Sequence, residues 1–83
     1  MPANEKPNAV CLGCWVRIDD PIFGEETIHL VEPAEERPEQ GRFSTAGPFA
    51  KALLGAQPGE TVFYDSPNGD CEEVVVLDFG LET

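Results

Sequence analysis

Basic side chains are scarce in this sequence. Its 83 residues include 16 Asp or Glu against 5 Lys or Arg, which gives a formal net charge of −11. The basic residues are scattered and form no cluster: Lys6, Arg17, Arg37, Arg42 and Lys51. Because binding to nucleic-acid phosphates depends on concentrated positive charge, we expect no direct contact with DNA or RNA. An acidic surface keeps a small domain soluble and suits a basic patch on a protein partner.

Long hydrophobic runs are also lacking. No apolar segment approaches the roughly 20 residues that span a bilayer. The polar segment Met1–Pro7 has no apolar stretch of the kind found in a secretory signal. We therefore expect a cytoplasmic protein without a membrane segment. The length, with 41% hydrophobic residues, indicates one small domain. We place it at residues 10–80, after a flexible lead at 1–9 and before a short tail at 81–83.

Catalytic motifs are few. His29 is the single histidine, and the sequence identifies no Ser-His-Asp set around it. No Gly-rich phosphate-binding motif is present, and the carboxylates form no convergent pair within a motif. The sequence thus predicts no catalytic residue and no cofactor. His29 is expected to be half exposed on a strand, opposite Ile28 and Leu30, near Trp15 or Arg17.

Cysteine provides a candidate metal site. Cys11 and Cys14 have C-x₂-C spacing, and Cys71 and His29 are available to complete a Cys₃His zinc site. However, a second closely spaced pair is missing, and Cys14 stands at a strand start where small apolar residues are common. We therefore favour the absence of a metal. A redox-active pair is favoured less still, because no strand-to-helix context follows it.

Alternating apolar residues predict a small sheet. The runs 14–19 and 27–31 both alternate, and we expect them to pair in an antiparallel manner. A short strand at 42–45 follows an acidic loop at 32–40, in which two prolines oppose a continuous helix. In the last strand, at 72–79, four consecutive apolar residues predict burial on both faces and a central position: Val74, Val75, Val76 and Leu77.

A short helix is expected between these strands. Pro48 suits a first helical turn, and Gly55 suits the left-handed residue that closes a helix. Phe49, Ala52 and Leu53 form an apolar stripe, and Leu54 is expected to be buried with Phe49 and Leu53. Two dipeptides then predict turns, Pro58-Gly59 and, between the last two strands, Asn68-Gly69.

This order of segments resembles the C-terminal domain of the bacterial transcript-cleavage factors GreA and GreB. The motifs that carry the resemblance are Ala52-Leu53-Leu54-Gly55, Pro58-Gly59-Glu60 and Ser66-Pro67-Asn68-Gly69, preceded by an acidic loop at 35–41. The resemblance covers residues 16–79. It implies an FKBP-like α+β fold, which is a small, twisted, mostly antiparallel sheet with one short helix packed across it.

The resemblance also implies RNA polymerase as the partner. In that family a Ser-Pro segment contacts a helical hairpin at the rim of the polymerase's secondary channel. Carried over by position, the contact residues are Ala46, Gly47, Pro48 and Phe49, with Gly47 where the family usually has Ser. The family's catalytic acidic residues lie at the tip of an N-terminal coiled coil. Only about ten residues precede the first strand here, fewer than such an arm requires.

We therefore expect a non-enzymatic polymerase-binding module. It would modulate elongation, or compete with Gre factors, without cleaving RNA itself. Two alternatives stay open. The first is an FKBP-like peptidyl-prolyl isomerase, which needs an aromatic-lined apolar cleft. The second is a structural or oligomerising domain, which would use exposed strand edges. The oligomeric state is not predicted.

Overall fold

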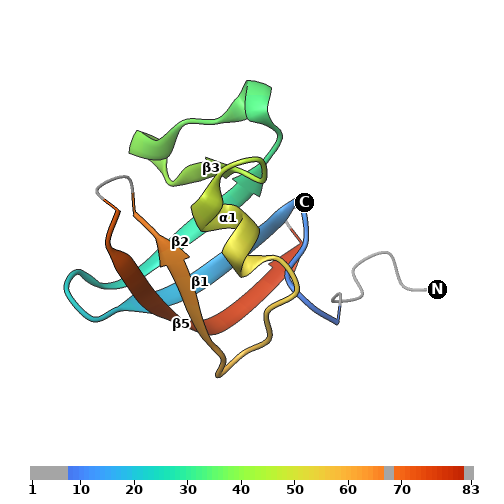
Figure 1. Ribbon diagram of the computed structural model, residues 1–83. Coiled ribbons are helices and arrows are strands. Elements are labelled where there is room, and N and C mark those ends of the chain that lie inside the picture. Colours follow the sequence, from blue (N-terminus) through green and yellow to red (C-terminus); the bar gives the residue numbers. More distant parts are fainter. Residues whose placement is uncertain (1–7, 67–68, 82–83) are drawn as a thin grey trace.

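A computed structural model describes residues 8–66 and 69–81. Within that part of the chain, one sheet has the strand order β3-β2-β1-β5-β4 and carries one α-helix, α1, on one face (Figure 1). The elements are β1 (Cys14–Asp20), β2 (Gly24–Val31), β3 (Arg42–Ser44), α1 (Pro48–Leu53), β4 (Thr61–Asp65) and β5 (Cys71–Leu81). Two short 3₁₀ helices, η1 (Pro33–Glu35) and η2 (Pro38–Gln40), form the acidic loop between β2 and β3.

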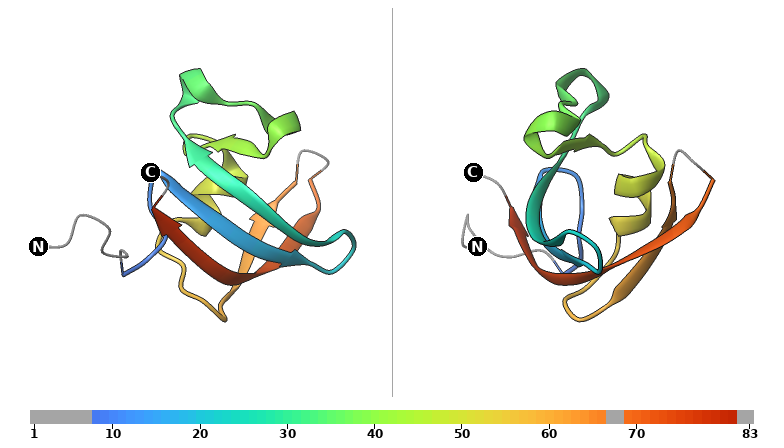
Figure 2. Two further views of the ribbon diagram at one scale, coloured as in Figure 1. Left: turned by 180° about the vertical axis from the view of Figure 1, so that it is seen from behind. Right: turned by 90° about the vertical axis from the view of Figure 1, so that its left-hand side faces the viewer.

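The sheet is mostly antiparallel. β1 pairs antiparallel with both β2 and β5, and β4 pairs antiparallel with β5, as the sequence predicts for the first pair. β3 is different, because the η1–η2 loop returns the chain so that β3 runs parallel to β2, with Leu30 opposite Phe43. Seen from the side, the sheet curls around α1 (Figure 2). The predicted α+β class is confirmed.

The core lies between the concave face of the sheet and α1. Apolar side chains from alternate strand positions point into it, as the alternation in 14–19 and 27–31 predicts. The most deeply buried large side chains are Ile28, Leu30, Leu53, Val16, Val74, Val76 and Cys14. Burying each of the Ile, Leu and Val side chains contributes roughly 1.5–3 kcal/mol before conformational entropy is counted. The opposite face of the sheet carries no helix among the described residues (Figure 2).

The predicted burial of β5 on both faces is wrong. Val74 and Val76 are buried, but Leu77 is 37% exposed. The cause is a β-bulge: Arg17 of β1 pairs with Asp78, whereas the next residue, Ile18, pairs with Val76. Leu77 is therefore an extra residue, after which Phe79 returns to the core. The four-residue apolar run reflects this inserted residue rather than a second covered face. β5 does lie inside the sheet, between β1 and β4.

α1 begins at Pro48 as predicted, and Gly55 follows it with φ +85°. Ala50 and Leu53 are its buried residues. Leu54 is 41% exposed, so the prediction that it is buried is wrong. The error arises because the helix ends at Leu53, and Leu54 already has extended backbone angles that turn its side chain away from the core.

The predicted turn at Pro58-Gly59 is confirmed. The Glu60 N–H donates to the Gln57 carbonyl oxygen (3.1 Å), and Gly59 has φ +89°, as the third residue of a type II turn requires. The turn predicted at Asn68-Gly69 lies partly outside the described residues. Most of the N-terminal lead expected at 1–9 lies outside them as well.

Candidate functional site

The predicted contact residues stand at the entry to α1, and a buried serine fixes their backbone. Ser44 Oγ accepts a hydrogen bond from the Ala46 N–H (3.0 Å), and the Ser44 carbonyl oxygen accepts one from the Gly47 N–H (3.0 Å). The Ser44 N–H in turn donates to the Glu36 carboxylate (3.2 Å). Pro48 is thereby held on the surface as the first helical residue. Sequence reasoning missed Ser44, although a Ser two residues before a turn amide is a typical signal.

Ala46 and Pro48 are exposed, whereas Gly47 and Phe49 are half buried. Gly47 occupies the N-cap position with φ −84° and ψ 159°, which is the extended conformation usual for a cap, and it offers no side-chain hydrogen bond. The four predicted residues are consecutive at the start of α1, and we call this segment the ridge.

A cleft of about 460 Å³ opens beside this ridge, between α1 and the curled sheet. Its floor includes Ile18 and Ile28, and Gly47, Pro48 and Phe49 form part of its wall. Aromatic side chains from four separate segments line it: Phe23, Phe43, Phe49 and Tyr64. Phe49 joins two of them, with its ring centroid 5.0 Å from that of Phe43 and 4.7 Å from that of Tyr64. The cleft is thus a preformed, mainly apolar site with four aromatic side chains in its lining.

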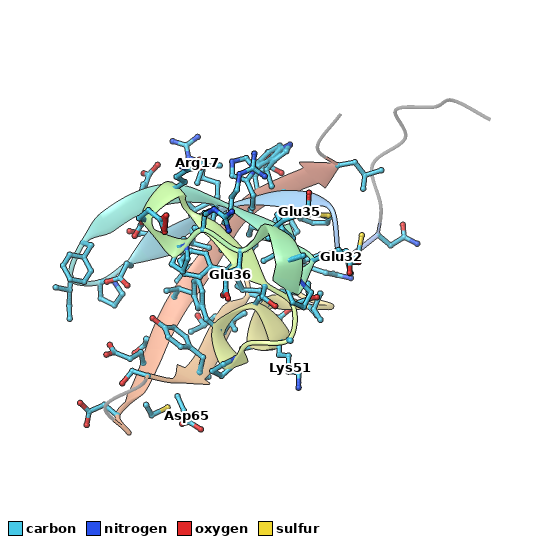
Figure 3. All side chains as sticks on the ribbon, turned by 90° about the horizontal axis from the view of Figure 1, so that it is seen from above. Arg17, Glu32, Glu35, Glu36, Lys51 and Asp65 are labelled. Carbon is cyan, nitrogen blue, oxygen red and sulfur yellow. The ribbon has the colours of Figure 1, made fainter. Side chains whose placement is uncertain are left out.

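Carboxylates surround the cleft. Asp20, Glu26, Glu36 and Asp65 all line it. Burial raises the pKa of the Tyr64 hydroxyl above its usual value, and the negative charges of Asp20, Glu72 and Glu26 raise the pKa further. Glu36 comes from the acidic loop and Asp65 from β4. The basic residues Arg17 and Lys51 project from opposite sides of the molecule (Figure 3). The mouth is therefore negatively charged, which favours a basic partner.

The turn between β1 and β2 exposes two large apolar side chains next to the cleft. Ile22 is 73% exposed and Phe23 is 79% exposed. Their backbone N–H groups both donate to Asp20 Oδ1, at 2.8 and 3.1 Å, so the turn has a fixed shape. Sequence reasoning missed this feature. The Asp-Pro pair at 20–21 and the Gly at 24 were the available signals.

The candidate zinc ligands are not brought together. Cys11 and Cys14 are in contact, with their sulfur atoms 3.5 Å apart. Cys71 begins β5, whereas Cys14 pairs with Leu81 at the other end of that strand, about 33 Å away when measured along the strand at the usual rise per residue. His29 lies opposite Trp15 and is half buried on the other face from Cys14. Among the described residues no three His, Cys, Asp or Glu side chains are arranged to hold a metal ion.

The arrangement of a curled sheet around one short helix is shared with solved structures. The GreA factor homolog 1 (Gfh1) of Thermus thermophilus matches with a TM-score of 0.72 and 29% identity, over 95% of this chain and 52% of that one. A GreA/GreB transcription elongation factor from Nitrosomonas europaea matches with a TM-score of 0.71 over 92% of this chain and 63% of that one. At 23% identity the latter likeness concerns the fold alone. The class is therefore the FKBP-like α+β domain of Gre-type factors.

Sequence comparison gives the particular family. The family model described as "Transcription elongation factor, GreA/GreB, C-term" matches residues 4–80, and the chain belongs to this family. Transcription elongation factor GreA of Oceanobacillus iheyensis is 40% identical over 70 residues, and GreA of Geobacillus kaustophilus is 40% identical over 67. These matches cover 83% and 80% of this chain but 44% and 42% of the relatives. The chain thus spans less than half the length of either GreA protein.

The comparisons confirm the family and the fold that the sequence resemblance implies. No helix in the described part of the chain is both long enough and apolar enough to cross a membrane.

Proposed function

We propose that this domain is a non-enzymatic module that binds RNA polymerase near its secondary channel, in the bacterial cytoplasm. The ridge formed by Ala46, Gly47, Pro48 and Phe49 would be the point of contact. By occupying that place, the module would modulate elongation or compete with complete Gre factors, and it would not cleave the transcript itself.

One observation carries the proposal: Gly47, Pro48 and Phe49 of the ridge form part of the wall of an aromatic-lined cleft whose mouth is acidic. A protein partner that places an apolar side chain in the cleft and basic residues on its rim would match both features. Membership of the GreA/GreB family supports polymerase as that partner. The Ser44 hydrogen bonds favour tight binding, because a ridge that is already rigid loses little entropy on association.

Capture of core RNA polymerase on the immobilised domain tests the proposal. Pro48→Asp introduces a charge on the ridge, yet Asp is well tolerated in the first turn of a helix, so the fold should be retained. Pro58→Asp is the matched control, because Pro58 is also an exposed proline in a turn, outside the residues that line the cleft. We expect capture to fall at least tenfold with Pro48→Asp, which corresponds to about 1.4 kcal/mol, and to be unchanged with Pro58→Asp.

Added GreA should displace the bound domain, and the domain alone should release no cleaved RNA from a backtracked complex. Absence of capture, or equal capture by both variants, would reject the ridge as a polymerase contact.

A second function has some support from the cleft. A peptidyl-prolyl isomerase requires an aromatic-lined apolar cleft, and the lining by Phe43, Phe49 and Tyr64 meets that requirement. The acidic mouth makes it the weaker candidate, because a neutral proline peptide gains nothing from that charge. Acceleration of cis–trans exchange in a short proline peptide, abolished by Phe49→Ala under conditions in which that variant is still folded, would establish it. An unchanged exchange rate would exclude it.

A further inference from the structure

Cys11 and Cys14 are held together by a β-turn that takes no part in the proposed polymerase contact. The Cys14 N–H donates to the Cys11 carbonyl oxygen (3.1 Å), and Gly13, the third residue of the turn, has φ +90°. The turn is anchored to the sheet because the Gly13 N–H donates to the Leu30 carbonyl oxygen (3.0 Å). The two cysteines therefore occupy the first and fourth positions of a fixed turn.

This geometry matches what a disulfide needs. The end Cα atoms of a β-turn lie within about 7 Å, and disulfides join Cα atoms roughly 4.4–6.8 Å apart. The two Sγ atoms are already 3.5 Å apart, and Cys14 Sγ points back at the Cys11 residue, whose N–H donates to it (3.4 Å). Closing the bond requires rotation of side chains and no rearrangement of the sheet.

The two thiols differ in access. Cys14 is 0% exposed, whereas Cys11 is half buried and so is within reach of a small molecule. Burial raises the pKa of the Cys14 thiol, although the Cys11 N–H partly opposes this change. An external reagent therefore meets Cys11 first, and Cys14 is placed to react only with Cys11.

The sequence alone disfavours a redox-active pair, but the geometry of the turn changes that expectation. We propose that Cys11 and Cys14 form a reversible dithiol–disulfide site that exchanges with small-molecule disulfides of the oxidised-glutathione class. The Cys11 thiolate attacks one sulfur of the small disulfide. A mixed disulfide forms at Cys11 and the first small thiol leaves. Cys14 then gives up its proton and attacks Cys11 Sγ, which forms the Cys11–Cys14 bond and expels the second small thiol. Two electrons pass to the small disulfide, and the two protein protons end on the two released thiols.

The bond would act on the segment that precedes β1. Val10 is bound to the end of the α1 region by two backbone hydrogen bonds, from its N–H to the Ala56 carbonyl oxygen and from the Gly55 N–H to its carbonyl oxygen. A disulfide between Cys11 and Cys14 would tie this segment to the first strand. Opening of residues 10–13 away from the domain would then become rarer in the oxidised state.

Equilibration of the full-length chain with mixtures of oxidised and reduced glutathione tests the proposal. After each mixture is quenched with an alkylating reagent, peptide mass spectrometry identifies the state of every cysteine. Cys71→Ser serves as the background, because Cys71 is exposed and distant from the pair. We expect Cys11 and Cys14 to lose alkylation together, with a mass decrease of two hydrogen atoms. Amide hydrogen exchange of residues 10–13 should slow in the oxidised protein.

Two variants keep the test decisive. In Cys14→Ser, glutathione should remain attached to Cys11. If that variant does not fold, Cys11→Ser provides the complementary result, in which Cys14 stays unmodified while the protein is folded. The proposal is overturned if native Cys11 retains glutathione, if Cys11 joins two chains together, or if neither cysteine is oxidised in any mixture. None of these outcomes depends on binding to polymerase.

Discussion

The ring of Phe49 in α1 rests against the ring of Tyr64 in β4, with their centroids 4.7 Å apart and their planes inclined at 58°. This contact joins the helix to the edge strand of the sheet. It also forms part of the cleft wall. Stability and binding at this site therefore share one pair of side chains.

Replacement of Phe49 by Ala should destabilise the domain. It removes the contacts with Phe43 and Tyr64 and leaves a void beside α1, and we expect a loss of about 2–3 kcal/mol, less than for a fully buried Phe. Urea unfolding measures this loss. Phe63→Ala is the control: Phe63 is 63% exposed on β4, so its loss should stay within about 1 kcal/mol. Equal losses would show that the aromatic contact adds nothing to stability.

Replacement of Gly47 by Ser should stabilise the domain. Gly47 already has the extended backbone of a helix cap, and a Cβ there would meet the Ser44 carbonyl oxygen at an ordinary 3.4 Å. A Ser hydroxyl can accept a hydrogen bond from an amide of the first turn, and we expect a gain of about 0.5 kcal/mol in urea unfolding. Gly47→Ala adds the Cβ without the hydroxyl. If Ala stabilises as much as Ser, capping is not the cause.

Replacement of Gly80 by Ala should strain the sheet. Trp15 pairs with Gly80 across β1 and β5, and a Cβ at position 80 would lie 3.0 Å from atoms of the indole ring. We expect a loss of about 1–3 kcal/mol and a shifted fluorescence maximum for Trp15, the single tryptophan. Trp15→Leu removes the obstructing ring, so Gly80→Ala should cost much less in that background. An equal cost in both backgrounds would place the strain elsewhere.

Tyr64 should titrate with a pKa above its ordinary value of 10.0, because burial and nearby carboxylates raise that pKa. A raised pKa in the folded state means that the folded protein holds this proton more tightly than the unfolded chain. The contribution of this proton to the stability of the fold is complete below pH 10.0, and it is lost as pH rises through the folded-state pKa of Tyr64. Tyr64 is the single tyrosine, so its absorbance reports the titration directly.

Two variants check the cause. Glu72, the cross-strand partner of Tyr64, is one of the carboxylates that raise its pKa, so Glu72→Gln should lower that pKa. Tyr64→Phe should remove part of the alkaline loss of stability. A Tyr64 titration at its ordinary value would contradict the assignment.

Much of the fold could be predicted because its signals are local. The alternation in β1 and β2 and the Pro48 and Gly55 boundaries of α1 follow from a few neighbouring residues. The parallel pairing of Leu30 with Phe43 could not be predicted in this way, since it depends on how the whole η1–η2 loop returns. The exposure of Leu54 also depends on one residue at a helix end, where sequence patterns are least precise.

The candidate site was predictable only in part. The ridge at 46–49 follows from the family resemblance and from Pro48. The cleft beside it does not, because Phe23, Phe43 and Tyr64 come from separate segments that the curl of the sheet brings together. Asp20 has two roles that no periodic pattern reveals. It fixes the turn that contains Ile22 and Phe23, and it adds negative charge beside Tyr64.

The extra residue at Leu77 determines where this chain can tolerate a change in length. Removing Leu77 would leave Val74, Val76 and Phe79 at strictly alternate positions, so all three would still face the core. Removing Val75 instead would make Val74 and Val76 neighbours, so one of these two side chains would face away from the core. β5 therefore holds one residue more than its pairing with β1 requires, and a variant without Leu77 should keep the same interior with a flatter strand.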